Sequence, residues 1–490
     1  MSDQKSLLSF DELLQSVYGK YIGFARCSGR FSFTSVTTDS RNVVPGSLFV
    51  PLVGEKQDGH KFIPEAIKAG ASVVFVENSV YEKNCERCLE LASKNLDTTF
   101  IATQNNMAAL QNAARAYVKK FPKLKKIAIT GSSGKTTTKE ILAAVLRQKY
   151  KVVATEGNFN SETGLPLSVF RIREEHEVGV FEMGMNRENE IGEIARVLEP
   201  NYAIITNIGS AHIGILGSRE NIACEKRKIF SYIRDDGAAF VPNDDDFVEF
   251  ISEGVKGKVF RFGKNVDESQ SGVTFISNDG LEGTRFAVDG LETRLRIPGI
   301  YNYTNALSCI ALAKLFGLDA RQIKAGIESV KSLGGRSNII AINTKKNSWG
   351  ESKKVMLMYD CYNANPDSME KALNLCASLE IKGRLIFVLG DMKELGDKSE
   401  EEHSRIGALA TLSKPDLLVF VGPEMKNGAK AAKLSGFDNL MYFPTADVDK
   451  VSSFILDYAK DDDFILFKAS RSMNFDLIAK KLDAKEALSA

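Results

Sequence analysis

The stretch Thr130-Gly131-Ser132-Ser133-Gly134-Lys135-Thr136-Thr137-Thr138 stands between an apolar run at residues 127–129 and an apolar segment with helical spacing at residues 141–146. This order predicts a β-strand, a glycine-rich loop and an α-helix. Backbone N–H groups in such a loop, together with the positive end of the helix, form a socket for phosphate. Lys135 is then placed to reach the outer phosphates and Thr136 to hold Mg²⁺. An ordinary glycine turn before a helix is the alternative interpretation.

The composition is that of a globular protein with several domains. The chain has 490 residues, which at about 150 residues per domain predicts three domains. The net charge of +1 provides no electrostatic argument for binding nucleic acid. No run of about 18 apolar residues exists, so no membrane span is predicted. The seven cysteines lack the spacing of a disulfide framework, and the start of the chain does not resemble a secretory signal; we therefore expect a cytoplasmic protein.

The distribution of apolar runs predicts α/β structure in three blocks. In residues 1–122, short apolar runs at 47–50 and 72–76 alternate with helical patterns, which predicts a small N-terminal α/β domain. Residues 123–334 form the central block, and residues 335–490 form the C-terminal block. The central block changes to short strands and turns near residues 280–298, and a helix is expected at 303–316.

The central block predicts a doubly wound parallel sheet of the kind found in phosphate-loop ATPases. Its four apolar runs each end in a polar or small residue and are separated by helical segments; they lie at residues 127–130, 151–155, 178–182 and 202–207. Ligands of such sheets bind outside the carboxyl ends of the strands.

The C-terminal block predicts a second, Rossmann-like α/β sheet. Strands are expected at residues 355–359, 385–389, 417–421 and 464–467, with helices between them. No Gly-x-Gly-x-x-Gly fingerprint occurs in the chain, so NAD is not predicted as a ligand.

Two residues near the predicted strand ends are candidates for metal binding. Glu182 closes the third central strand, where a carboxylate beside a phosphate loop suits Mg²⁺. His212 follows the fourth strand and could bind metal or phosphate. A solvated strand end for Glu182, and a packed or solvated ring for His212, are the competing interpretations.

Lys226 occupies an unexpected position. Ser218 is a candidate cap for a helix that runs through residue 235, and the apolar stripe of this helix is Ile222, Lys226, Ile229, Phe230 and Ile233. An ordinary lysine would extend its ammonium to water. A desolvated lysine would instead have a lowered pKa and a reactive amine, which CO₂ would convert into a carbamate that could bind a second Mg²⁺.

Four asparagines lie where a ligand could bind. Asn158 and Asn160 belong to a loop expected to lie over the phosphate site, although asparagine also forms turns. Asn302 and Asn305 lie one helical turn apart at the start of a helix, where they could contact an adenine edge or cap the helix.

The third block contributes Arg336 and Asp360. Asp360 ends the predicted strand at 355–359, and Arg336 lies in a glycine-rich turn at the start of the block. Both could close over a nucleotide. Taken singly, each would more often be a surface charge.

Together these residues resemble the Mur ligase family, the ATP-dependent amide-forming enzymes of peptidoglycan synthesis. The resemblance covers nearly the whole chain, and the residues that carry it are Thr37-Thr38-Asp39-Ser40-Arg41, Asp58-Gly59-His60, the Gly-Lys-Thr-Thr loop, Glu182, Asn207, His212, Lys226, Asn302, Asn305, Arg336 and Asp360. Two further motifs, at residues 360–366 and 389–396, are similar to those of family members that use D-alanyl-D-alanine.

The resemblance implies an activity and its partners. The carboxylate of a UDP-N-acetylmuramoyl-tripeptide would attack the γ-phosphate of ATP, and the amine of D-alanyl-D-alanine would attack the resulting acyl phosphate. The cofactors implied are ATP and Mg²⁺, and a monomer is expected. The alternatives are a related ligase of the Mur or folylpolyglutamate type and a non-catalytic nucleotide-binding scaffold.

The resemblance also implies roles for individual residues. Lys135, Glu182, His212 and Lys226 would be catalytic. Thr136 with Glu182 would hold one Mg²⁺, and His212 with carbamylated Lys226 the second. The residues implied in ATP binding are Gly131, Ser132, Ser133, Gly134, Lys135, Thr136, Thr137, Asn302, Asn305, Arg336 and Asp360. Those implied in binding the other substrates are Ser40 and Arg41 at the uridine end, and Asn158, Asn160, Asn363 and Asn365.

Overall fold

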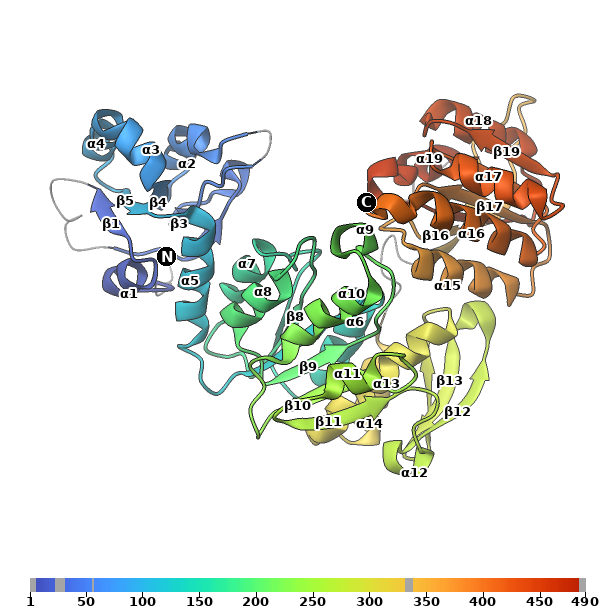
Figure 1. Ribbon diagram of the computed structural model, residues 1–490, viewed down its shortest axis with the longest axis horizontal. Helices are drawn as coiled ribbons and strands as arrows, with labels where there is room; N and C mark the ends of the chain where they lie inside the picture. The colour runs from blue at the N-terminus through green and yellow to red at the C-terminus, as the bar shows by residue number, and fades with distance from the viewer. Residues whose placement is uncertain (1–5, 23–30, 55–56, 331–337, 484–490) are drawn as a thin grey trace.

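The computed structural model describes residues 6–22, 31–54, 57–330 and 338–483. It contains three α/β lobes that follow one another along the chain, coloured blue, cyan to yellow, and orange to red in Figure 1. The predicted fold class is therefore confirmed. Within the described ranges, no helix is long and apolar enough to cross a membrane.

The N-terminal lobe is built on a five-stranded sheet in the order β1-β5-β4-β3-β2, in which only β1 is antiparallel to its neighbour. The strands are β1 (Lys20–Ile22), β2 (Ser35–Thr37), β3 (Ser47–Phe49), β4 (Ala71–Glu77) and β5 (Thr99–Thr103). The helices are α1 (Phe10–Ser16), α2 (Ile63–Lys68), α3 (Asn78–Lys83), α4 (Cys85–Lys94) and α5 (Asn106–Val118). The predicted strands at 47–50 and 72–76 are β3 and β4.

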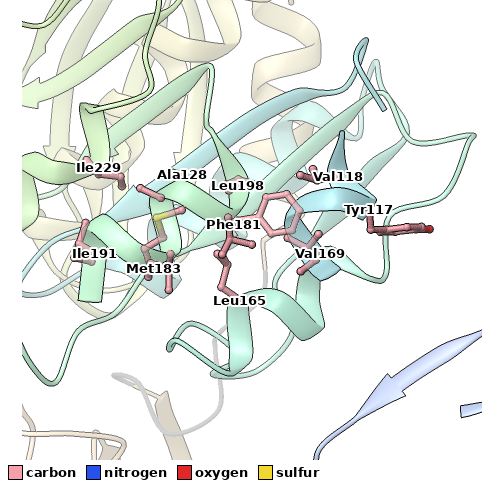
Figure 2. Packing of buried hydrophobic residues seen from close by; sticks show 14 of the residues in the cluster. Tyr117, Val118, Ala128, Leu165, Val169, Phe181, Met183, Ile191, Leu198 and Ile229 are labelled. Carbon is pink, nitrogen blue, oxygen red and sulfur yellow. The ribbon is translucent and has the colours of Figure 1, made fainter. Parts of the chain in front are cut away.

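Helix α5 joins the N-terminal lobe to the central one. Figure 2 shows Tyr117 and Val118, at its end, packed near Val169 and Phe181 of the central lobe. The Tyr117 hydroxyl donates a hydrogen bond to the Ile172 carbonyl at 2.6 Å. One of the apolar clusters extends through both lobes, from Leu7 to Ile251. The division predicted between residues 122 and 123 follows α5 directly and stays a prediction.

The central sheet has six parallel strands in the order β11-β10-β9-β6-β8-β7. The strands are β6 (Lys125–Thr130), β7 (Val152–Ala154), β8 (Val178–Glu182), β9 (Tyr202–Ile205), β10 (Ala238–Pro242) and β11 (Lys258–Phe262). The helices are α6 (Lys135–Leu146), α7 (Gly164–Val169), α8 (Glu190–Leu198), α9 (Ile213–Leu216), α10 (Arg219–Arg227), α11 (Val248–Ser252) and α12 (Glu268–Ser271). The four predicted strands, β6 to β9, are confirmed with their parallel arrangement.

An antiparallel meander and two helices complete this lobe. The meander consists of β12 (Val273–Asn278), β13 (Thr284–Val288) and β14 (Leu291–Leu295), followed by α13 (Ile300–Leu315) and α14 (Ala320–Glu328). Helix α13 confirms the helix predicted at 303–316.

The helix predicted from Ser218 through residue 235 is only partly right. Ser218 caps α10 by accepting from the Asn221 N–H, but the α-helix ends at Arg227 and a 3₁₀ turn (Lys228–Phe230) follows. The tighter turn provides partners for backbone groups that the end of an α-helix leaves unpaired.

The C-terminal sheet has the order β15-β16-β20-β17-β18-β19, with β15 antiparallel and the other strands parallel. The strands are β15 (Asn338–Asn343), β16 (Lys354–Tyr359), β17 (Leu385–Gly390), β18 (Leu417–Val421), β19 (Leu440–Phe443) and β20 (Phe464–Lys468). The helices are α15 (Pro366–Ala377), α16 (Ser399–Leu412), α17 (Met425–Leu434), α18 (Val448–Tyr458) and α19 (Phe475–Leu482). The four predicted strands are confirmed; β15 and β19 were not predicted. The division at 334/335 and Arg336 lie outside the described residues.

Candidate active site

A cavity of about 290 Å³ lies where the central and C-terminal lobes meet. It collects side chains that the sequence placed in three separate regions. The predicted site residues that line it are Ser132, Ser133, Gly134, Lys135, Thr137, Asn158, Asn160, Glu182, His212, Asn302, Asn305, Asp360, Asn363 and Asn365. The cavity therefore lies at the carboxyl ends of the central strands, as expected for a doubly wound sheet.

The remaining predicted residues lie behind or away from this cavity. Gly131 and Thr136 contact residues of its wall, and Lys226 lies near Met185, which is part of the wall. Ser40 and Arg41 lie in the N-terminal lobe, in the short 3₁₀ helix that follows β2. The structure does not bring them to the cavity.

A larger cavity, of about 1060 Å³, lies between the edge strand β11, the strand β12 and helix α13. It contains none of the predicted site residues that the structure describes. We place the candidate site in the smaller cavity, because that is where the ionisable and phosphate-binding groups converge.

The phosphate loop is shaped by contacts that only a glycine permits. Gly134 has φ +83°, and a Cβ atom there would lie 2.8 Å from Asn305 Oδ1. Asn207 holds the preceding turn, because its carbonyl accepts from the Ser132 N–H at 3.0 Å and its Oδ1 accepts from the Ser133 N–H at 2.9 Å. Helix α6 then begins without a side-chain cap, which leaves its positive end directed at the cavity.

Lys135 lies over this loop. Its Nζ donates a hydrogen bond to the Gly131 carbonyl at 2.7 Å. The ammonium is therefore held beside the start of α6, where both would attract phosphate.

Glu182 and Thr136 form a pair suited to a hard cation. The Thr136 hydroxyl donates to Glu182 Oε2 at 2.7 Å, and Asn160 Nδ2 donates to Glu182 Oε1 at 2.7 Å. Glu182 is buried, with 1% of its surface exposed. Both carboxylate oxygens are thus fixed, and a hydroxyl and a carboxylate lie side by side at the loop, as Mg²⁺ bound to a phosphate loop requires.

Lys226 is fully buried, and the sequence interpretation of a desolvated lysine agrees with its surroundings. Its side chain is 1% exposed and its Nζ lies 3.9 Å from Met185 Sδ. No carboxylate within the described residues lies within 4.0 Å of it. The neighbouring Glu225 instead pairs with Lys228 at 2.7 Å and accepts from the backbone N–H groups of Asn189 and Ile191. Burial and the positive charge of Lys135 hold the pKa of Lys226 well below its usual range.

His212 meets a residue of the C-terminal lobe. Its Nδ1 lies 2.6 Å from Glu394 Oε2. Burial, together with the positive charges of Lys226 and Lys135, lowers the pKa of His212, although Glu394 acts to raise it. This direction favours the neutral imidazole, the form whose second ring nitrogen has a lone pair for a ligand.

The C-terminal motif at 360–366 is held by a buried lysine. Lys468, 1% exposed, donates to Asp360 Oδ2 at 2.7 Å and to the Asn363 carbonyl at 3.3 Å. Asn365 caps α15, because its Oδ1 accepts from the Ser368 N–H at 2.9 Å. These contacts fix the motif against the cavity.

Sequence reasoning did not assign a role in the site to four residues that shape it. Asn207, Glu394 and Lys468 belong to motifs that supported the family resemblance or adjoin them, so the same motifs could have identified them. Lys371 also lines the cavity, and no local pattern distinguishes it from a lysine on the surface of a helix.

Comparisons with known proteins agree with this geometry. Three family models match the chain: "Mur ligase family, catalytic domain" at residues 32–118, "Mur ligase middle domain" at 129–313 and "Mur ligase, glutamate ligase domain" at 348–471. The UDP-N-acetylmuramoyl-tripeptide–D-alanyl-D-alanine ligase of Treponema pallidum is 41% identical over 473 residues, which cover 95% of this chain and 97% of the relative.

Solved structures are similar over nearly the whole chain. MurF from Acinetobacter baumannii superposes with a TM-score of 0.80 at 28% identity, covering 96% of this chain and 98% of that one. The MurF ligase from Thermotoga maritima, solved in complex with ADP, has a TM-score of 0.74 at 26% identity, with coverage of 91% and 96%.

Proposed function

This chain belongs to the Mur ligase family, and from that premise we propose that it joins D-alanyl-D-alanine to a UDP-N-acetylmuramoyl-tripeptide while ATP is converted into ADP and phosphate. The observation that carries the proposal is the 41% identity, over 95% of the chain, to a ligase of that name. The cavity supports it, because a phosphate loop and the motif at 360–366 face each other there. The enzyme would thus act in peptidoglycan precursor synthesis, in the cytoplasm.

The reaction divides into two steps. In the first, a carboxylate oxygen of the tripeptide attacks the γ-phosphorus of ATP, the bond from that phosphorus to the bridging oxygen breaks, and ADP leaves. In the second, the amine of D-alanyl-D-alanine attacks the acyl carbon, loses a proton and displaces phosphate. Lys135 and the N-terminus of α6 stabilise negative charge on the phosphates during the first step.

The residues present fit two magnesium ions. Thr136 and Glu182 would hold one, and His212 with a carbamate on Lys226 the other. The described residues contain no group of three or more His, Cys, Asp or Glu side chains placed to hold a metal ion, so hydroxyl, carbamate and nucleotide oxygens would complete these sites. Bound Mg²⁺ supplies charge neutralisation at the phosphates.

The environment of Lys226 supports the proposed carbamate. A neutral amine can attack CO₂, forming an N–C bond and releasing one proton, whereas an ammonium cannot. Lys226→Ala should remove this carboxylate, and short carboxylic acids should partly restore activity by occupying its place. Incubation of the wild type with ¹³CO₂ should give a carbamate ¹³C resonance that Lys226→Ala lacks. Full activity of Lys226→Ala without added acid would show that the lysine is only structural.

The other site residues divide between the substrates. Asn302 and Asn305 would contact the adenine edge of ATP, and Arg336 and Asp360 would contact ATP from the C-terminal domain. Ser40 and Arg41 would bind the uridine end of the sugar nucleotide. Arg41 is suited to an anionic ligand because its side chain is 86% exposed, although Asp39 pairs with it at 2.6 Å. Asn158, Asn160, Asn363 and Asn365 would contact the peptide substrates.

We assign each domain one substrate. Residues 1–122 would bind the UDP substrate, residues 123–334 ATP, and residues 335–490 the amino substrate. This division is consistent with the phosphate loop in the central lobe and with a cavity whose opposite wall is formed by residues of the C-terminal lobe.

The proposal is tested by supplying each substrate separately. The purified chain is incubated with ATP, Mg²⁺, D-alanyl-D-alanine and a UDP-tripeptide whose third residue is either meso-diaminopimelate or lysine. Mass spectrometry should detect a UDP-pentapeptide, and phosphate release should require all components. L-alanyl-L-alanine is the matched control and should react slowly. Product from folate and glutamate instead would favour the folylpolyglutamate type, and the absence of any ATP turnover would favour a scaffold.

A further inference from the structure

Lys371 reaches from the C-terminal lobe into the phosphate loop of the central lobe. It lies on α15, and its Nζ donates a hydrogen bond to Ser133 Oγ at 2.8 Å. Ser133 directly precedes Gly134 and Lys135, and Lys371 lines the same cavity as all three. Two lysines from different domains therefore border one phosphate-binding loop.

The position of Lys371 is set by the docking of α15. Asp367, one helical turn earlier, accepts from both the backbone N–H and the hydroxyl of Ser210, at 2.6 and 2.9 Å. Residues four apart lie on the same face of a helix. The contacts of Asp367 thus direct Lys371 at the loop.

The charge of Lys371 has no partner of opposite sign in direct contact. Among the described residues, no carboxylate lies within 4.0 Å of its Nζ; the acids that act on it from further away are Asp367, Asp245 and Glu370. Each of these has other partners: Asp367 binds Ser210, Asp245 accepts from backbone N–H groups, and Glu370 pairs with Arg405.

An ammonium with a single neutral partner is a poor arrangement for a partly buried charge. Among the described residues, its one hydrogen-bond acceptor is the hydroxyl of Ser133, and burial lowers the pKa of Lys371. An anion in the cavity would give it a stronger, charge-assisted hydrogen bond. The neighbouring loop is itself built to bind phosphate.

We propose that Lys371 binds the outer phosphates of the nucleotide and thereby ties the C-terminal lobe to the ATP-loaded central lobe. This rests on the proposed use of ATP. Lys371 would then act as a nucleotide-binding residue contributed by the opposite domain, beside Lys135, with Ser133 as its partner in the absence of phosphate.

The test compares nucleotides that differ in their outer phosphates. Affinities of the full-length chain for AMP-PNP and for AMP are measured with Mg²⁺ by isothermal calorimetry, the weaker ligand by displacement. Lys371→Met should weaken AMP-PNP binding by about 10- to 100-fold and leave AMP binding unchanged, as expected when one charged hydrogen bond is lost. Lys371→Arg should retain most of the affinity for AMP-PNP.

The control is Lys382→Met, at an exposed lysine of the same lobe in the segment after α15. It should bind both nucleotides like the wild type. An unchanged affinity of folded Lys371→Met for AMP-PNP, or an equal loss for AMP-PNP and AMP, would overturn the proposal, and the neutral variant Lys371→Gln provides the same test if the methionine variant does not fold. A wild type that binds no AMP-PNP would instead contradict the proposed function.

Discussion

The two junctions between the three lobes are built differently. Where the N-terminal lobe meets the central one, α5 packs mainly by apolar side chains, and the centroids of the Tyr117 and Phe170 rings lie 5.4 Å apart. The ion pair of Arg115 with Glu199, at 2.6 Å, lies beside this apolar contact. Where the central lobe meets the C-terminal one, the contacts are mainly polar: Ser210 with Asp367, Ser133 with Lys371 and His212 with Glu394. Figure 1 shows α9, next to His212, beside the C-terminal lobe.

The difference indicates which junction is permanent. Burial of apolar surface is favourable with or without a ligand, so the first junction should persist through the reaction. At the second junction, hydrogen bonds between the two lobes can be replaced by hydrogen bonds to water or to substrate at little net cost in free energy. The active-site cavity lies at that second junction, where binding and release require contacts that can be remade.

The largest effect on stability is expected at the apolar junction. Tyr117→Ala should lower the free energy of unfolding by about 3–5 kcal/mol, because it leaves a cavity between α5 and the central lobe. Urea denaturation measures this. Tyr18→Ala is the matched control: Tyr18 is 89% exposed, so its variant should be within about 0.5 kcal/mol of the wild type. Equal stabilities of the two variants would remove the distinction between the junctions.

At the polar junction, the effect should fall on turnover instead. Lys135→Ala should reduce phosphate release by about 10²- to 10³-fold or more, since it removes a preorganised charge from the phosphate loop. The free energy of unfolding should stay close to that of the wild type. Lys382→Ala, at an exposed lysine, should leave both quantities unchanged. Normal turnover by folded Lys135→Ala would refute the assignment of the loop.

Docking of the C-terminal lobe can be weakened without touching a polar side chain. The Gly214 N–H donates to the Glu394 carbonyl at 3.0 Å, and a side chain on Gly214 would clash with the backbone of Leu395 and Gly396. In Gly214→Val, the clash should destabilise the docked arrangement of the two lobes by about 1–3 kcal/mol. Because the site is complete only when the lobes are docked, kcat/KM should fall by roughly 10-fold or more. Small-angle scattering should show a larger radius of gyration.

The neighbouring exposed side chain of α9 provides the control. Ile215→Ala should change neither the radius nor kcat/KM, because Ile215 is 45% exposed. If Gly214→Val kept the wild-type radius of gyration and activity, we would conclude that the close approach of the backbones at Gly214 and at residues 394–396 is not needed to complete the site.

The smallest effect on the free energy of unfolding is expected at the apolar junction. Tyr117→Phe removes the hydrogen bond to the Ile172 carbonyl and a longer one, of 3.4 Å, that the hydroxyl accepts from Arg173 Nη1. Arg173 Nη1 also donates to the Ile172 carbonyl at 2.8 Å, so this carbonyl keeps a partner. We expect a loss of about 0.5–1 kcal/mol in the free energy of unfolding and no change in turnover. A loss as large as that of Tyr117→Ala would mean that the hydroxyl, not the packed ring, holds this junction.

Most of the site was predictable because its elements are local. The strand, loop and helix around Lys135, the carboxylate at the end of β8 and the lysine in an apolar stripe each have a pattern within about 20 residues of sequence. The helix limits around Lys226 were less predictable, because the change from α-helix to 3₁₀ turn depends on backbone partners and not on the apolar stripe, which is buried throughout.

The sequence by itself determined the parallel central sheet, the phosphate loop at its carboxyl edge and the family to which the chain belongs, since periodicity and motif spacing are properties of neighbouring residues. Only the tertiary structure decided which side chains of the third lobe face that loop. Lys371 and Ser133 are 238 residues apart in the sequence, and nothing local marks either as a partner of the other. Their contact exists because α15 docks through Asp367 on Ser210, which places a charge from one domain beside a phosphate site in another.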